Sequence, residues 1–150
     1  MPHPHDASAV TALYQELILD HYRRPRNKGT LANADAHVVR KNPLCGDEIE
    51  LELRFDGDRI AEAKFGGRGC SISQASASMM TELVRGKPAV EARALIRRFA
   101  ELLRGSPDAA ADERLGDARA LRGVARLPVR VPCAAMAWTA LEEGLKAAES

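Results

Sequence analysis

Residues 66 to 80 read GGRGCSISQASASMM, and this stretch decides how the rest of the chain is interpreted. Three glycines just before a cysteine give the backbone conformational freedom and allow close approach of neighbouring segments. The Ser, Ala and Met residues behind Cys70 favour a helix that packs tightly. Cys70 is therefore expected at or beside a helix N-terminus, where the positive end of the helix dipole favours a thiolate over a thiol.

The two other cysteines also fall where loops meet regular structure. Cys45 belongs to the turn-rich segment NPLCGD at 42–47, and Cys133 follows PVRVP at 128–132, ahead of an alanine-rich run. Together with Asp47 the three cysteines offer three sulfur atoms and one oxygen, a donor set that suits tetrahedral zinc. Their spacing matches no zinc finger. The pattern alone thus leaves a metal site and buried structural cysteines both open.

Alternation of apolar and charged residues predicts a small antiparallel sheet. The segment 48–55, EIELELRF, alternates cleanly, and DGD at 56–58 closes a hairpin onto a second strand at 60–65. The segment 37–40 is a further strand. This hairpin would bring Cys45 and Cys70 to the same end of the sheet.

Helical periodicity marks the rest of the chain. Helices are predicted over 10–22, 73–84 and 89–103 and from Cys133 or Ala134 to Leu145; 105–113 is expected to be a polar loop, followed by a short helical turn over 115–123. The basic segment 23–29 is interpreted as a solvated loop rather than a binding patch. Met79, Met80 and Trp138 are assigned to packing. The fold class is α+β: a three-stranded antiparallel sheet flanked by helices, in one domain over 1–150 with a disordered tail at 1–8.

Composition narrows the function classes. The chain has 150 residues, 45% hydrophobic and 29% charged, which is typical of one globular domain. A net charge of +1 and 4% aromatic residues give no reason to expect nucleic-acid binding. No secretory signal and no apolar run of membrane-spanning length is visible, so a cytoplasmic location is expected. In that reducing compartment, three cysteines favour metal binding or catalysis over disulfides.

Three motifs carry a family resemblance. They are Asn-Pro-x-Cys-Gly-Asp at 42–47, Gly-x-Gly-Cys-Ser-Ile-Ser-x-Ala-Ser-Ala-Ser-Met-Met at 67–80, and Arg-x-x-Cys-Ala-x-x-x-Trp, which begins at Arg130. In this order they resemble the SufU branch of the IscU/NifU-like iron–sulfur cluster assembly proteins. The resemblance extends from about Tyr14 to Leu145 and implies the SufE/IscU/NifU-like fold.

The resemblance also implies a reaction and a ligand set. Zn²⁺ would be held by Cys45, Asp47, Cys70 and Cys133. Cys45 would accept persulfide sulfur from a pyridoxal-phosphate-dependent cysteine desulfurase of the SufS type. The sulfur would then pass to the scaffold complex of the SUF system, which makes the chain a sulfurtransferase and an activator of the desulfurase.

Arg130 matches a position that is arginine in the SufU branch. A permanent guanidinium there would offset the charge of three thiolates and a carboxylate and stabilise a persulfide anion. The alternative is a surface arginine in a modest ion pair.

Two other functions remain open. Zinc could be purely structural, or the same ligands could hold a transient [2Fe–2S] cluster on a scaffold protein. Three features argue against the scaffold: Pro132 stands where scaffold proteins have a histidine, LPVR at 127–130 is not their Leu-Pro-Pro-Val-Lys motif, and the segment 99–123 resembles the insertion of SufU-like chains. Pro132 also departs from the lysine common in the SufU branch, which affects local charge and partner affinity rather than the ligand set.

Overall fold

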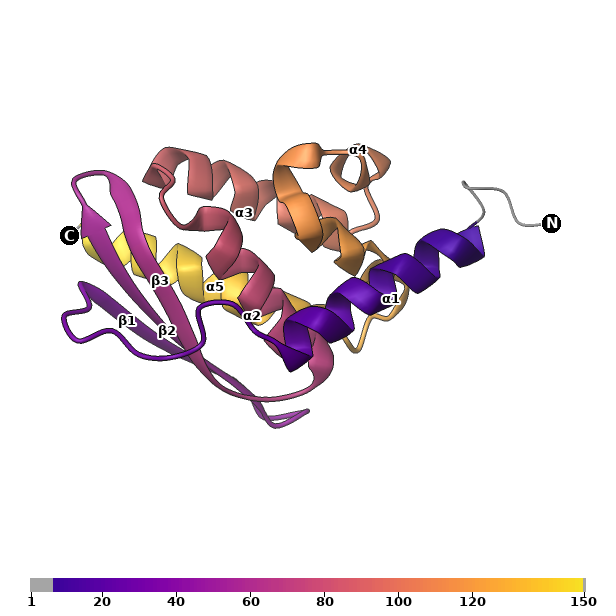
Figure 1. The fold of residues 1–150 in the computed structure, drawn as a ribbon, viewed down its shortest axis with the longest axis horizontal. Helices are drawn as coiled ribbons and strands as arrows, with labels where there is room; N and C mark the ends of the chain where they lie inside the picture. The colour runs from indigo at the N-terminus through magenta and orange to yellow at the C-terminus, as the bar shows by residue number, and fades with distance from the viewer. Residues whose placement is uncertain (1–6, 150) are drawn as a thin grey trace.

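A three-stranded antiparallel sheet, covered on one face by helices, forms the frame of the molecule in a computed structural model (Figure 1). The structure describes residues 7–149, with side chains from residue 14 onward. The expected α+β class is confirmed. None of the helices in this described part combines the length and apolar character needed to cross a membrane. The tail expected at 1–8 falls mostly outside the described residues, since Ala7 already begins the first helix.

The sheet has the order β1-β2-β3, with β1 at Ala36–Asn42, β2 at Asp47–Asp56 and β3 at Arg59–Arg68. Alternate side chains of β2 are fully buried, as the alternation in the sequence predicted: Ile49, Leu51 and Leu53. Asp47 pairs with Asn42 on β1, and Glu48 pairs with Arg68 on β3. This register places the turn that carries Cys45 and the last residues of β3 at the same end of the sheet, as expected.

The long helices also lie where the sequence predicted them. They are α1 (Ala7–Arg23), α2 (Ser71–Val84), α3 (Ala89–Leu103) and α5 (Val131–Ala148). Figure 1 shows α5 running along the sheet behind the strands, with α2 beside it. Helix α5 begins earlier than the predicted start at Cys133, because Pro132 fits the first turn, where a missing N–H costs nothing.

The segment between α3 and α5 is more regular than predicted. The expected polar loop contains a short helix, α4 (Pro107–Ala110), and the helical turn is part of a longer 3-10 segment, η1 (Glu113–Arg126). Ser106 caps α4 by accepting from the N–H of Ala109 at 3.2 Å. Asp112 caps η1 by accepting from the N–H of Arg114 at 3.0 Å. These local caps stabilise short helical pieces that have no long apolar period.

The core closes around Trp138, which packs as predicted. Its ring stacks on Phe99 with centroids 4.2 Å apart. Its indole N–H donates to Ser76 Oγ at 3.1 Å, and that hydroxyl donates to the carbonyl of Ala134 at 2.6 Å. Met79 and Met80 are buried as well. The Ser76 hydroxyl thus ties α2 to the first turns of α5.

A buried histidine connects three elements. His21 of α1 is fully buried, with Nδ1 2.8 Å from Ser78 Oγ on α2 and Nε2 2.9 Å from Asp117 Oδ2 on η1. Ser78 Oγ also accepts from the backbone N–H of Arg26 at 2.8 Å. Buried polar groups of this kind are costly unless they are paired. The network therefore fixes α1 and η1 against α2, the helix that carries Cys70 at its N-cap.

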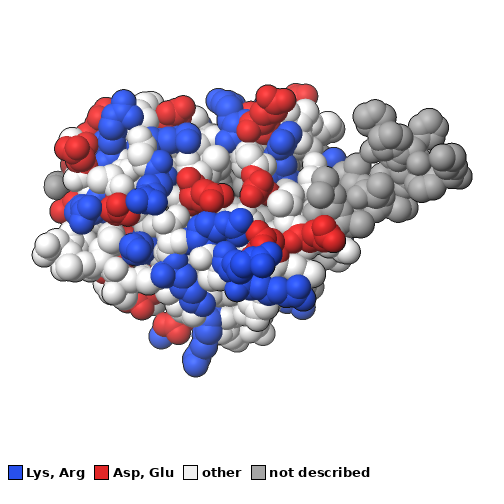
Figure 2. Space-filling view, viewed as in Figure 1, with Lys and Arg blue, Asp and Glu red and all other residues white. Residues whose placement is uncertain are grey.

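The basic segment 23–29 lies on the surface. Figure 2 shows Lys and Arg side chains gathered below the centre of this face, near the end of α1. Arg23, Arg24 and Lys28 are exposed. Arg24 and Arg26 both pair with Asp20, the latter at 2.8 Å. The segment is thus a solvated loop whose charge is partly neutralised within the chain.

Candidate metal centre

Separate elements bring the three cysteines and Asp47 to one end of the molecule. Cys45 lies in the turn between β1 and β2, and Asp47 is the first residue of β2. Cys70 is the N-cap of α2, as its glycine-rich approach predicted. Cys133 lies in the first turn of α5. Two helix N-termini therefore point their unpaired amides toward this end of the sheet, which favours anionic ligands there.

The donor atoms lie close together. Cys45 Sγ is 3.0 Å from Asp47 Oδ2 and 3.5 Å from Cys133 Sγ. One ligand atom from each of these three residues lies within 4.8 Å of the other two. Cys70 Sγ is 3.6 Å from Asp47 Oδ2, so it adjoins the set through the carboxylate. Three of the four residues expected from the sequence thus form one compact group, and Cys70 contacts that group through Asp47.

Asp47 is held in place by the backbone of the glycine-rich segment. Its Oδ1 accepts from the N–H of Cys70 at 2.9 Å. The chain approaches so closely here that a Cβ atom at Gly69 would lie 2.4 Å from Asp47 Oδ1 and 2.5 Å from Ser73 Oγ. Only glycine leaves room for this contact. Close approach of neighbouring segments was one of the two uses expected of these glycines. Gly69 serves that use at this site.

The donor set fits a tetrahedral zinc ion. With Zn–S bonds of about 2.3 Å and Zn–O bonds of about 2.0 Å, tetrahedral ligand atoms stand roughly 3.5 to 3.8 Å apart. The distances from Cys45 to Cys133 and from Cys70 to Asp47, 3.5 and 3.6 Å, lie close to that spacing. Cys45 Sγ and Asp47 Oδ2, 3.0 Å apart, would have to separate slightly to admit the ion. Three sulfurs and one carboxylate oxygen are also ligands that zinc accepts.

The surroundings of the site lower the pKa of Asp47 and raise the pKa of Cys133. Burial alone would raise the pKa of Asp47, but hydrogen bonds from Cys45, Cys133 and the N–H of Cys70 outweigh it and hold the pKa below its usual value. Burial, followed by the nearby Asp47 carboxylate, raises the pKa of Cys133 far above that of a free thiol. A buried thiol of this kind needs a cation to stay ionised.

Arg130 supplies a permanent cation beside the sulfurs. It is the N-cap residue of α5, three residues before Cys133. The charge of Cys70 and a hydrogen bond with Cys133 raise the pKa of Arg130 above its usual value. The exposed guanidinium thus lies near enough to Cys70 and Cys133 for its charge to balance part of theirs.

Exposure differs sharply among the three cysteines. Cys45 is exposed, Cys70 is half-buried and Cys133 is buried. Leu44, directly before Cys45, is 95% exposed. A reactant that approaches the site would therefore reach the sulfur of Cys45 before the others.

A second group of potential ligands lies away from the cysteines. His21, Glu82 and Asp117 bring donor atoms within 4.8 Å of one another. Both nitrogens of His21 already have hydrogen-bond partners, and Glu82 lies 3.6 Å from Arg26. We therefore interpret this group as packing. Sequence reasoning missed it, because His21 and Asp117 are 96 residues apart.

Comparison with known proteins gives consistent matches. The chain is 46% identical over 137 residues to the zinc-dependent sulfurtransferase SufU of Bacillus subtilis, covering 91% of both chains. It is 45% identical to the iron–sulfur cluster assembly scaffold protein IscU of Streptococcus pyogenes, covering 93% of this chain and 86% of that one.

A solved structure agrees with these matches in fold. It belongs to a protein from Fervidobacterium islandicum assigned as an iron–sulfur cluster assembly scaffold protein for the SUF system. The two chains are 36% identical and superpose with a TM-score of 0.81, over 89% of this chain and 97% of the other. The family model described as the NifU-like N terminal domain matches residues 13–149. The chain therefore belongs to the NifU-like N-terminal domain family.

Proposed function

We propose that this chain is a zinc-dependent sulfurtransferase that accepts persulfide sulfur on Cys45 and relays it to iron–sulfur cluster assembly. One observation carries the proposal: Cys45 is the exposed member of a donor set whose other members, Asp47, Cys70 and Cys133, are half-buried or buried. The relative from Bacillus subtilis, a zinc-dependent sulfurtransferase, supports the same reaction class.

Cys45, Asp47, Cys70 and Cys133 would hold the metal. Bound zinc keeps the thiols ionised at neutral pH and shields them until a partner docks. Asp47 positions the set through its bond to the N–H of Cys70. Asp47, Cys70 and Cys133 would still hold the ion while the exposed Cys45 thiolate reacts.

The transfer step follows from thiol chemistry. The Cys45 thiolate attacks the outer sulfur of a persulfide on the partner protein. A new S–S bond forms at Cys45 Sγ while the S–S bond of the donor breaks, and the partner's cysteine leaves as a thiolate. No external oxidant or reductant is needed. Arg130, which lies near the sulfurs, would stabilise the persulfide anion formed on Cys45.

The partner that fits this chemistry is a cysteine desulfurase of the SufS type, with the SUF scaffold complex as the later sulfur acceptor. The names of the relatives support a role in iron–sulfur cluster assembly. The exposed Leu44 beside Cys45, and the exposed Leu127 and Val129 before Arg130, offer apolar contacts around the entry to the site.

The second candidate is a scaffold for [2Fe–2S] assembly. This candidate is supported by the IscU relative from Streptococcus pyogenes, which is almost as similar to the chain as SufU of Bacillus subtilis is. The same four side chains would then hold iron rather than zinc. The two candidates differ in what the protein carries after reaction.

Anaerobic native mass spectrometry tests the proposal. The protein is incubated with a SufS-type desulfurase, cysteine and ferrous iron. We expect retained zinc and one added sulfur that maps to Cys45, and no added sulfur on Cys45→Ser. A zinc-free species with two irons and two sulfides would establish the scaffold instead. Unchanged zinc protein without added sulfur would indicate structural zinc.

The role of Arg130 needs its own variant. Arg130→Gln should keep zinc but lower the yield of persulfide on Cys45. Arg54→Gln, an exposed arginine on β2 far from the site, is the matched control and should behave as wild type. Equal persulfide yields for both variants would remove Arg130 from the transfer step.

A further inference from the structure

Three arginines line one depression on the side of the molecule formed by the end of α3 and by η1. They are Arg104, Arg122 and Arg126, and the depression has a volume of about 630 Å³. All three side chains are exposed. No aspartate or glutamate is among the lining residues in the described part of the chain. A volume of this size is typical of small-molecule sites.

In the part of the chain whose side chains are described, no ion pair neutralises the guanidinium charges of these arginines. Among residues 14–149, Arg104 and Arg126 have no carboxylate partner for their guanidinium groups. Nearby arginines behave differently: Arg98 and Arg114 both pair with Asp112 at 2.7 Å, which uses that carboxylate fully. Like charges that share a depression without a counter-charge repel each other, so an anion that enters it is attracted by all three.

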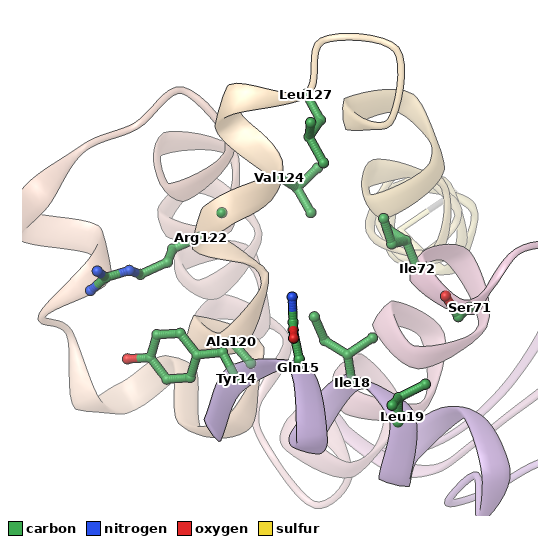
Figure 3. Close-up of a pocket in the computed structure, with 11 residues that line it drawn as sticks. Tyr14, Gln15, Ile18, Leu19, Ser71, Ile72, Ala120, Arg122, Val124 and Leu127 are labelled. Atoms are coloured by element: carbon green, nitrogen blue, oxygen red, sulfur yellow. The ribbon is translucent and has the colours of Figure 1, made fainter. Parts of the chain in front are cut away.

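Arg122 is positioned rather than free. Its guanidinium carbon lies 5.3 Å from the centre of the Tyr14 ring, a cation–π contact. Figure 3 shows the Arg122 side chain pointing away from the neighbouring apolar groove, with Tyr14 beside it. Stacking restrains the guanidinium while leaving its N–H donors available.

Small and apolar residues complete the lining. Gly105, Gly123 and Ala125 expose backbone and little side chain, and Leu102 and Pro107 provide apolar surface.

We propose that this depression, defined by Arg104, Arg122 and Arg126, binds a small organic anion with two or more phosphate or carboxylate groups. Guanidinium groups bind both kinds of group in a bidentate manner, so the shared chemistry is multivalent negative charge. The site is separate from the sulfur centre.

The test is titration of the zinc-loaded full chain at low ionic strength, followed by NMR of backbone amides. Fructose 1,6-bisphosphate and tricarballylate are the probes, one for each anion class. We expect saturable binding with shifts at Gly105, Gly123 and Ala125. Tighter binding of the bisphosphate would indicate that the natural ligand carries phosphate groups. Tighter binding of tricarballylate would indicate that it carries carboxylate groups. Binding should weaken at roughly 0.5 M salt, where exposed charges are screened.

Matched variants decide whether the arginines are responsible. Arg104→Gln and Arg126→Gln should each weaken binding roughly two- to fivefold, and the double variant roughly tenfold. Arg54→Gln changes the same charge on β2 and should bind as wild type.

Three results would overturn the proposal. One is the absence of saturable binding. Another is equal affinity for the double variant and wild type. The third is tighter binding of tetraglutamate than of either small anion, which would make the surface a contact for an acidic protein segment.

Discussion

Asp47 Oδ1 accepts a hydrogen bond from the backbone N–H of Cys70 at 2.9 Å, while Oδ2 lies 3.0 Å from Cys45 Sγ. One carboxylate thus connects the start of β2 with the N-terminus of α2, across 23 residues of sequence. Because each oxygen has its own partner, Asp47 has two separable roles, as an anchor for the Cys70 segment and as a metal ligand.

Two substitutions of Asp47 separate these roles. Asp47→Asn keeps an oxygen that can accept from the Cys70 N–H but loses the charge, so zinc affinity should fall by more than roughly tenfold while the metal-free protein loses less stability than with Asp47→Ala. Asp47→Ala removes the acceptor as well and should lower the free energy of unfolding of the metal-free protein by about 1–3 kcal/mol. Chelator competition and urea denaturation measure the two effects. Equal stability of both metal-free variants would contradict the anchor role.

The close approach at Gly69 predicts a sensitive position. The Cβ of Gly69→Ala would meet Asp47 Oδ1 at 2.4 Å, so the carboxylate must move away from the Cys70 N–H. Zinc affinity should fall even where the circular dichroism spectrum is unchanged. Gly66→Ala is the control, because nothing lies within 4 Å of its added Cβ. If both variants bind zinc equally well, Gly69 is not needed for the geometry of the site.

Much of the frame could be predicted because it depends on local patterns. The alternation from Glu48 to Phe55 predicted β2, and three glycines before Cys70 predicted a helix N-cap at that cysteine. The sequence predicted too little helical structure between α3 and α5, where η1 is longer than the expected turn. The short helical pieces there depend on single caps, such as Asp112 with the Arg114 N–H, rather than on a repeating apolar period.

The contacts that assemble the site could not be predicted from spacing. The resemblance supplied the ligand set, but the bond from the Cys70 N–H to Asp47 depends on the register of β2 and β3. The link from His21 to Asp117 likewise forms only when α1 and η1 pack against each other and against the serine-bearing helix α2. Neither link leaves a periodic signal in the sequence.

Ser76 should affect both stability and metal binding. Its hydroxyl accepts from the Trp138 indole N–H and donates to the carbonyl of Ala134, the residue after Cys133. Ser76→Ala leaves the buried indole N–H of Trp138 without a partner and removes the bond to the Ala134 carbonyl, so it should lower the free energy of unfolding by about 1–3 kcal/mol. Zinc binding should also weaken, because Cys133 is less well positioned. Urea denaturation and chelator competition give the two values. Ser71→Ala, which removes a half-buried hydroxyl of the same helix, should change neither. A Ser76→Ala protein as stable as wild type would show that water satisfies these groups.

Asp112 gives the fold a predictable pH dependence. Hydrogen bonds from Arg114, reinforced by Arg98 against the opposing effect of burial, hold the pKa of Asp112 far below its usual 3.8. A carboxyl whose pKa is lowered by folding stabilises the protein above its unfolded pKa, and that contribution is lost as the pH falls from about 4 toward the folded value.

Asp112→Asn should therefore lower the free energy of unfolding at pH 7 by about 1 kcal/mol, while the amide still caps η1. The difference from wild type should shrink steadily below pH 4, because the unfolded carboxyl takes up its proton there. Urea denaturation of both proteins, freed of metal so that zinc release does not contribute, measures this difference at each pH. Asp108→Asn, which neutralises an exposed carboxylate on α4, should give no such trend. A difference that stays constant between pH 7 and pH 3 would mean that the ion pairs of Asp112 do not contribute to stability.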